Sequence, residues 1–158
     1  MTAPHQVGLK IGELAPNFTA PTLRGEMVTL STYAGRKVVF VFISAHCDPC
    51  HEILPDLQSL GSKAARAGVE FVLVSSNDME ETRTLVEKEH IRLPVLVAPR
   101  STTSFFEDYK ATEVPSYCLV NEQGSIQSSG HPYQGWEAWK TLTNSWETRD
   151  GSTIIGRR

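Results

Sequence analysis

The sequence predicts an α/β sandwich with parallel strands at the centre of its sheet and an antiparallel hairpin at one edge. Two observations support this prediction. Apolar runs suited to buried strands alternate with segments of helical periodicity, an order typical of layered α/β folds. The last two strand-like runs are separated only by residues 121–124, a spacing that suits a tight hairpin and not a crossover helix.

The N-terminal part of the chain predicts a hairpin followed by a buried strand. Residues 17–20 and 27–30 are short strand-like runs, and Gly25 between them can supply the turn. Residues 38–44 read Val-Val-Phe-Val-Phe-Ile-Ser, a nearly continuous apolar run. Such a run is expected of a strand that is buried on both faces.

A long helix is expected after this strand. Apolar residues recur at helical spacing from Pro49 until Gly68, which should end the helix, and Pro55 is expected to kink it. Residues 69–75 then predict a second strand, and a capping-box pattern predicts a helix over 78–90. The remaining predicted elements are strands at 94–97, 116–120 and 125–128 and helices at 102–109 and 135–146.

Length and composition indicate one domain and exclude several classes of partner. The 158 residues predict a domain over 14–146 between tails at 1–13 and 147–158. The net charge of −3 and the scattered basic residues predict no nucleic-acid role. No apolar stretch approaches the roughly 20 residues of a membrane span, and the first residues lack the pattern of a signal peptide. We expect a monomer, cytoplasmic if the chain is complete and periplasmic or membrane-anchored if an N-terminal leader or anchor has been removed.

Two cysteines, Cys47 and Cys50, stand where the buried strand gives way to the long helix. The unpaired N–H groups and the dipole of a helix N-terminus stabilise a thiolate, and the thiolate is the nucleophile in disulfide exchange. We therefore expect Cys47 to be the attacking thiol. Cys50, three residues further along the same helical face, is placed to resolve a mixed disulfide.

Other prominent side chains are expected to be structural. Cys118 lies within an apolar strand and is expected to be a small buried hydrophobe rather than a third redox partner. His5, His90 and His131 are expected on the surface. Three tryptophans should pack one face of the last helix onto the sheet: Trp136, Trp139 and Trp146.

The cysteine pair also allows two metal-based interpretations. With His51 the motif also reads CxxCH, the pattern for covalent c-type haem, and Met79 is an imaginable second ligand. A small cytochrome, however, is mainly helical and has no need of the valine- and phenylalanine-rich strands. A zinc site usually needs a second pair of ligands, and no further CxxC or HxxxH follows.

Several of these features, in this order, resemble thioredoxin-like thiol-disulfide oxidoreductases. They are a buried strand that ends in CxxC, Pro55 five residues past the second cysteine, and Val114-Pro115 about 65 residues later. The leading segment 12–18 with its hairpin, and the extra strand and helix before Val114, resemble the TlpA/ResA and AhpC/TSA redoxin branch. The resemblance covers roughly residues 11–146.

This resemblance implies a thioredoxin-like sandwich, with a central mixed sheet, helices on both faces and an added N-terminal β-hairpin. It implies a cis peptide bond before Pro115, so that the Val114 backbone meets an extended substrate polypeptide. These two residues and the loop residues His46, Asp48 and Pro49 would shape the groove. The partners would be protein dithiols or disulfides, with no cofactor or metal, because electrons come from another dithiol protein.

The chain also departs from the family pattern. His46 takes the place of a tryptophan before the first cysteine, and Val41 and Ile53 stand where a buried acid assists the second cysteine. Glu52 lies about 100° around the helix from Ile53 and is expected to point elsewhere. Proton transfer to Cys50 would then use water, His46 or a carboxylate that the sequence does not identify.

Two further hypotheses share the same fold. A peroxiredoxin-like thiol peroxidase carries a proline and a Ser or Thr seven and three residues before its cysteine. Here Ser44 fits that pattern, but Phe40 replaces the proline. A non-catalytic redox sensor or binding module would use the disulfide to alter a partner surface and would turn over no disulfide substrate.

Overall fold

The computed structural model describes residues 8–151, and residues 1–7 and 152–158, which form much of the two predicted tails, lie outside the described range. One sheet has five strands: β3 (Lys37–Ile43), β4 (Val69–Ser75), β5 (Val95–Val97), β6 (Ser116–Val120) and β7 (Ile126–Gly130). Their order is β5–β4–β3–β6–β7. The first three strands in this order are parallel, and β6 is antiparallel to both of its neighbours. The predicted mixed sheet, with parallel strands inside and a hairpin at one edge, is confirmed.

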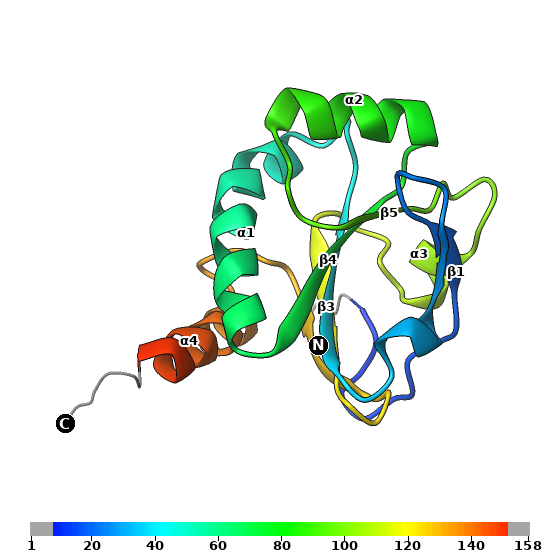
Figure 1. The fold of residues 1–158 in the computed structure, drawn as a ribbon. Coiled ribbons are helices and arrows are strands. Elements are labelled where there is room, and N and C mark those ends of the chain that lie inside the picture. Colours follow the sequence, from blue (N-terminus) through cyan, green and yellow to red (C-terminus); the bar gives the residue numbers. More distant parts are fainter. Residues whose placement is uncertain (1–7, 152–158) are drawn as a thin grey trace, which may run out of the picture.

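The other elements form layers on the two faces of this sheet. They are a hairpin of β1 (Thr19–Pro21) and β2 (Met27–Thr29), the 3-10 helix η1 (Leu30–Tyr33), and helices α1 (Asp48–Arg66), α2 (Met79–Glu89), α3 (Phe105–Asp108) and α4 (Glu137–Gly151). Helices α1 and α4 cover one face, and α3 and the hairpin cover the other, as Figure 1 shows. No helix within residues 8–151 is both long and apolar enough to cross a bilayer.

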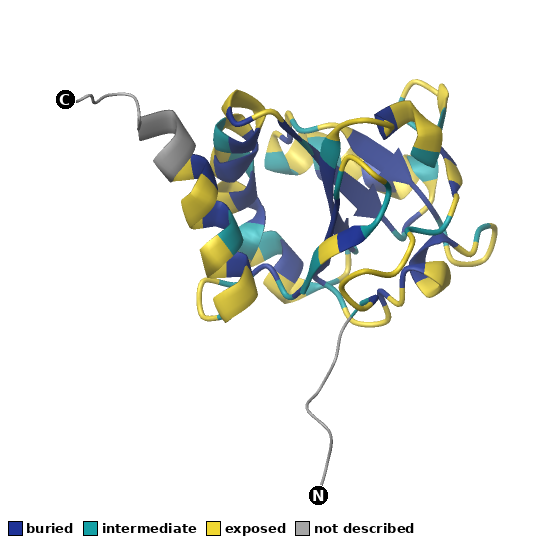
Figure 2. Cartoon of the chain, turned by 90° about the horizontal axis from the view of Figure 1, so that it is seen from below, coloured by how far each residue is buried: buried dark blue, intermediate teal, exposed yellow. Residues whose placement is uncertain are grey.

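The central strand β3 contributes to a separate hydrophobic core on each face. Val39, Val41 and Ile43 pack with α1 and α4, whereas the alternate residues pack with the aromatic rings of α3. All six side chains from Val38 to Ile43 are at most 1% exposed. In Figure 2 the buried residues follow the strands and the inner sides of the helices. The end of β3 is therefore fixed by packing on both sides.

Helix α3 is shorter than the predicted helix over 102–109. The N–H groups of Thr102 and Thr103 both donate to the Pro99 carbonyl, so this stretch is a turn. The helix ends before Lys110, whose φ of 54° is left-handed. The 3-10 helix η1 was not predicted.

Helix α4 and its tryptophans also differ from the prediction. Trp139 and Trp146 are buried against Phe71, as expected. Trp136, however, precedes the helix and lies in a turn in which its N–H donates to the Tyr133 carbonyl. The expectation of three tryptophans on one helical face is therefore wrong for Trp136.

Both ends of the described chain extend the ordered structure beyond the limits expected for the tails. Leu9, near the start of the described range, is 5% exposed, and the Gly12 N–H donates to the Ile126 carbonyl at 2.9 Å. At the other end, α4 runs to Gly151, and Glu147 on it pairs with a lysine of α1 at 3.1 Å. Packing against the sheet and α1 accounts for both extensions.

We expect Phe40→Ala to destabilise the fold by about 3–5 kcal/mol, because the cavity opens in the middle of a fully buried aromatic cluster. Denaturant unfolding of the disulfide form measures this change. The matched control is Met27→Ala on the exposed hairpin, which should change stability by less than about 0.5 kcal/mol. Equal effects of the two substitutions would contradict the assigned core.

Candidate active site

The cysteine pair lies at the junction of β3 and α1. Cys47 and Cys50 form a disulfide with their Cα atoms 5.2 Å apart. Cys47 is the N-cap of α1, and its sulfur accepts the Cys50 N–H at 3.2 Å. Cys50 is 1% exposed, whereas Cys47 is partly exposed. An incoming thiol or disulfide therefore reaches Cys47 first.

The surroundings of Cys47 favour a thiolate once the disulfide is reduced. The Cys50 N–H already points at its sulfur, and hydrogen bonds to a charged form stabilise that form. The N-terminus of the 19-residue helix α1 adds a favourable dipole. Asp48 in the first turn opposes this effect, but it is exposed and Pro49 beside it is exposed too. The helix N-terminus and the Cys50 N–H thus both favour negative charge on the Cys47 sulfur.

The backbone before Pro115 faces the disulfide. The Val114–Pro115 peptide bond is cis, which confirms the prediction. The Val114 carbonyl oxygen lies 3.6 Å from the sulfur of Cys47. Within the described part of the chain, the Val114 N–H has no hydrogen-bond partner. Val114 therefore presents an unpaired N–H donor together with the carbonyl oxygen that lies beside the Cys47 sulfur.

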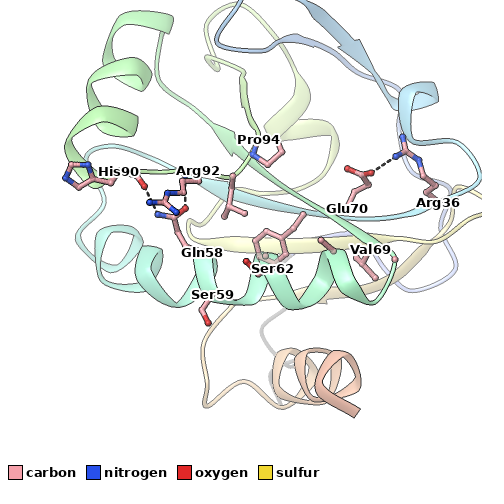
Figure 3. Close-up of a pocket in the computed structure, with 14 residues that line it drawn as sticks. Arg36, Gln58, Ser59, Ser62, Val69, Glu70, His90, Arg92 and Pro94 are labelled. Atoms are coloured by element: carbon pink, nitrogen blue, oxygen red, sulfur yellow. Dashed lines mark hydrogen bonds and ion pairs between the residues drawn. The ribbon is translucent and has the colours of Figure 1, made fainter. Parts of the chain in front are cut away.

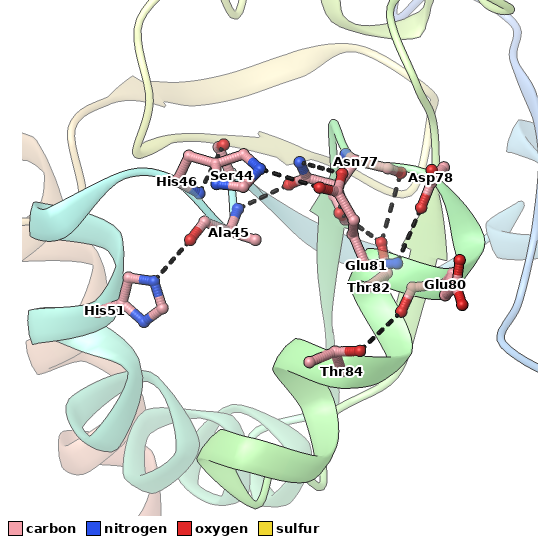
Figure 4. A network of polar contacts seen from close by, with 11 residues as sticks. Ser44, Ala45, His46, His51, Asn77, Asp78, Glu80, Glu81, Thr82 and Thr84 are labelled. Atoms are coloured by element: carbon pink, nitrogen blue, oxygen red, sulfur yellow. Dashed lines mark hydrogen bonds and ion pairs between the residues drawn. The ribbon is translucent and has the colours of Figure 1, made fainter.

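His51 fixes the loop before Cys47 to α2. Its Nε2 donates to the Ala45 carbonyl at 2.7 Å (Figure 4). Its Nδ1 lies 3.1 Å from the Glu89 carboxylate. Both partners are acceptors, so only the protonated ring can donate to both. The carbonyl of Ala45 is the largest cause that raises the pKa of His51 above its ordinary value, followed by Glu89. The sequence suggested His51 as a haem ligand, but both of its ring nitrogens are engaged within the protein.

A second polar network fixes the same loop from the other side. The Ala45 N–H donates to the side chain of Asn77 at 2.6 Å, and the Asn77 amide donates to Glu81 at 3.1 Å. Glu81 also lies 3.1 Å from the His46 ring, as Figure 4 shows. The N-cap Asp78 holds the first turn of α2 by accepting the Glu81 N–H. Sequence reasoning missed Asn77 and Glu81, because only the capping pattern signalled this turn.

His131 was expected on the surface, and that expectation is wrong. Its side chain is only 12% exposed, and its Nδ1 donates to the Pro115 carbonyl at 2.8 Å. The strand before it was predicted to end at residue 128, whereas β7 runs to Gly130 and pairs it with Tyr117. Extending the predicted strand to Gly130 would have placed His131 opposite Ser116, the residue that follows Pro115.

The places where the family carries a buried acid hold no carboxylate here. Val41 is fully buried in the core, Ile53 packs partly buried against it, and Glu52 is exposed. Cys118 is 1% exposed, and burial raises the pKa of its thiol to about 12. As expected, Cys118 is a small buried hydrophobe with no access to the disulfide chemistry.

The structure has one hollow beside the cysteine site and a larger one away from it. A cavity of about 410 Å³ lies between α2 and the loop, beside His46 and His51. A larger one of about 890 Å³ lies between the second half of α1 and the start of β4, away from the cysteines (Figure 3). At one end Gln58 joins α1 to the backbone of His90 and Arg92.

Among residues 8–151, no group of three or more His, Cys, Asp or Glu side chains is placed to hold a metal ion.

Known proteins share this chain's sequence pattern and fold. The model of the AhpC/TSA family matches residues 11–129. The thioredoxin-like protein YneN of Bacillus subtilis is 27% identical over 126 residues, covering 77% of this chain and 72% of that protein. The thiol-disulfide oxidoreductase ResA of Halalkalibacterium halodurans is 28% identical over 118 residues, covering 74% of this chain and 66% of that protein. The chain thus spans about two thirds of the length of that relative.

Solved structures show the same fold at lower identity. A thiol:disulfide interchange protein from a Bacteroides species superposes with a TM-score of 0.75 at 22% identity, covering 95% of this chain and 96% of that one. The thioredoxin domain of a thiol-disulfide oxidoreductase from Bacteroides vulgatus gives a TM-score of 0.73 at 22% identity, with coverages of 87% and 98%. These likenesses establish a thioredoxin-like sandwich.

The contacts of His51 predict a pH-dependent contribution to stability. Because its folded-state pKa is raised, this contribution is complete below the unfolded pKa of about 6.5 and is lost as the pH rises through the folded value. We expect His51→Gln to cost about 1 kcal/mol of unfolding free energy near pH 6, and progressively less at higher pH. Denaturant unfolding of the wild type and His51→Gln, both in the disulfide form, at several pH values measures the difference.

The control for this experiment is His90→Asn. His90 is exposed at the left-handed C-cap of α2, with φ 55°, which asparagine tolerates. The described hydrogen bonds of His90 use its backbone only, so this replacement should change stability by less than about 0.5 kcal/mol. A pH-independent difference between the wild type and His51→Gln would show that the charge of the ring is not what stabilises the loop.

Proposed function

This chain belongs to the AhpC/TSA family and is a thiol-disulfide oxidoreductase, and we propose that Cys47 and Cys50 exchange a disulfide with partner proteins. One observation carries the assignment of roles. The two sulfurs share the first turn of α1, but Cys47 is partly exposed at the helix N-cap and Cys50 is 1% exposed beneath it. This asymmetry supports an attacking and a resolving thiol.

In the proposed reaction, the Cys47 thiolate attacks one sulfur of a substrate disulfide. The substrate S–S bond breaks, a mixed disulfide forms, and the substrate's other sulfur leaves as a thiolate that takes up a proton. The thiol of Cys50 then loses its proton and attacks the sulfur of Cys47, which releases the second substrate thiol. The substrate gains two electrons, and the Cys47–Cys50 disulfide remains. The reverse sequence oxidises a substrate dithiol.

Substrate docking is proposed along Val114. Its carbonyl oxygen, 3.6 Å from the sulfur of Cys47, and its unpaired N–H offer the two hydrogen bonds that an extended chain makes with a strand edge. Pro115 beside it has no N–H to compete for the substrate. The loop residues His46, Asp48 and Pro49 are exposed on the other side of Cys47 and would form the opposite wall of the groove.

Titration against dithiol buffers of known potential tests the redox pair directly. Counting alkylated cysteines by mass should show one reversible two-electron transition, confined to Cys47 and Cys50, while Cys118 stays unmodified in the folded protein. The midpoint then tells whether the protein favours reduction or oxidation of its partners. The lack of any reversible transition would overturn the proposed function.

The proposed roles of the two cysteines predict different behaviour for the two serine variants. We expect Cys50→Ser to accumulate mixed disulfides, because Cys47 still attacks and nothing resolves the product. Cys47→Ser should abolish exchange, since the two remaining thiols, Cys50 and Cys118, are both buried. Non-reducing electrophoresis and mass spectrometry after incubation with disulfide-bonded insulin measure both outcomes, with Cys118→Ala as the control that leaves exchange intact.

Two results would contradict this scheme. Equal trapping by the two variants would reject the assignment of attacking and resolving thiols. Hydrogen peroxide consumption that survives Cys50→Ser but not Cys47→Ser would instead indicate a thiol peroxidase. Against the latter, the place of the peroxiredoxin proline is taken by Phe40, which is fully buried in the aromatic core.

A further inference from the structure

The segment that carries Val114 lies just beyond the end of the β6–β7 ladder. The last residue pair of that ladder joins Tyr117 to Gly130, so no pairing with β7 reaches residues 113–115. The next residue after β7 is His131, and it lies where a further pair would have formed. The contacts of this side chain therefore decide how the docking segment is held.

His131 contacts both neighbours of Val114. Its Nδ1 donates to the carbonyl of Pro115 at 2.8 Å, and its Nε2 lies 3.4 Å from the carboxylate of Glu113. Val114 lies between these two residues. Within residues 8–151 its N–H has no hydrogen-bond partner, and its carbonyl faces Cys47. One ring thus spans the residues on either side of the proposed docking residue without using its backbone groups.

The ring of His131 is itself held in place. It stacks on Tyr133, with centroids 5.5 Å apart and an interplanar angle of 14°, and meets Trp136 edge to face at 4.8 Å. Gly130 permits this arrangement, because its φ is +149° and a Cβ there would overlap the Trp136 ring. A ring packed on two sides and 12% exposed has little freedom to turn away from Pro115.

We propose that His131 is a positioning residue for substrate docking: it holds residues 113–115 so that the backbone of Val114 is presented to an incoming polypeptide beside Cys47. This inference rests on the proposed function. Its effect should be confined to polypeptide substrates, because a small disulfide is too short to pair with Val114 and needs only the sulfur of Cys47. The chemistry of the two thiols should not depend on it.

The test compares His131→Phe with the wild type. Phenylalanine keeps the aromatic packing on Tyr133 and Trp136 but donates to neither Pro115 nor Glu113. Single-turnover exchange of the dithiol form is followed with excess disulfide-bonded insulin and, separately, with hydroxyethyl disulfide. We expect the half-saturating insulin concentration to rise roughly three- to tenfold with the limiting rate unchanged. The rate with hydroxyethyl disulfide and the midpoint potential should match the wild type.

A second variant and a control complete the experiment. His131→Asn places an amide nitrogen near the position of Nδ1, so it should recover part of the insulin affinity. His90→Asn, on the exposed end of α2, should behave as wild type. Unchanged half-saturation in His131→Phe, or equal losses with insulin and hydroxyethyl disulfide, would overturn the inference. If the wild type itself exchanges with neither disulfide, the proposed function fails instead, so the two failures are distinguishable.

Discussion

Burial of β3 on both faces is the constraint on which the position of the redox site depends. Its side chains from Val38 to Ile43 are at most 1% exposed, and alternate residues belong to different cores. Close-packed interiors resist displacement, so the C-terminal end of β3 can shift only if both cores rearrange. The short loop from that end leads directly to Cys47, and α1 begins there. Packing thus buries Cys50 and leaves Cys47 partly exposed. A loop that the core did not hold would not fix this difference in exposure.

Around this fixed point, two histidines add polar contacts to the segments that carry Ala45 and Val114, whose side chains pack partly buried against the core. His51 joins the loop before the cysteines to Glu89 on α2, and His131 joins the carbonyl of Pro115 to Glu113. Both rings connect a backbone carbonyl to a carboxylate. Imidazole suits this task because its two nitrogens sit on a rigid ring with only two rotatable bonds, so little side-chain entropy is lost. The two walls of the proposed groove are therefore held in similar ways by unrelated parts of the chain.

Local patterns in the sequence predicted what depends on neighbouring residues. Periodicity gave the strands and helices, and the CxxC spacing at a strand–helix junction gave the cysteine pair. The contacts of His131 depend instead on where β7 ends, and the last residues of β7 are small or polar: Ser128, Ser129 and Gly130. Such residues show no apolar alternation, so the predicted strand stopped too early. Asn77 was missed for a related reason, because its contact with the active-site loop joins residues 32 positions apart.

The chain departs from the family pattern in having no acid at Val41 or Ile53, and the packing of the site bears on this difference. Val41 and Ile53 belong to or pack against the apolar cluster that buries Cys50, and apolar surroundings disfavour a thiolate. At Cys47 the helix N-terminus and the Cys50 N–H favour one. The difference in reactivity that we propose for the two thiols thus rests on burial and helix position, without a buried acid at these two places. Two carboxylates near the site, those of Glu89 and Glu113, are engaged with histidines that hold backbone in place. In the proposed scheme, histidine–carboxylate pairs hold the backbone around the groove, and the fold sets the order in which the sulfurs react.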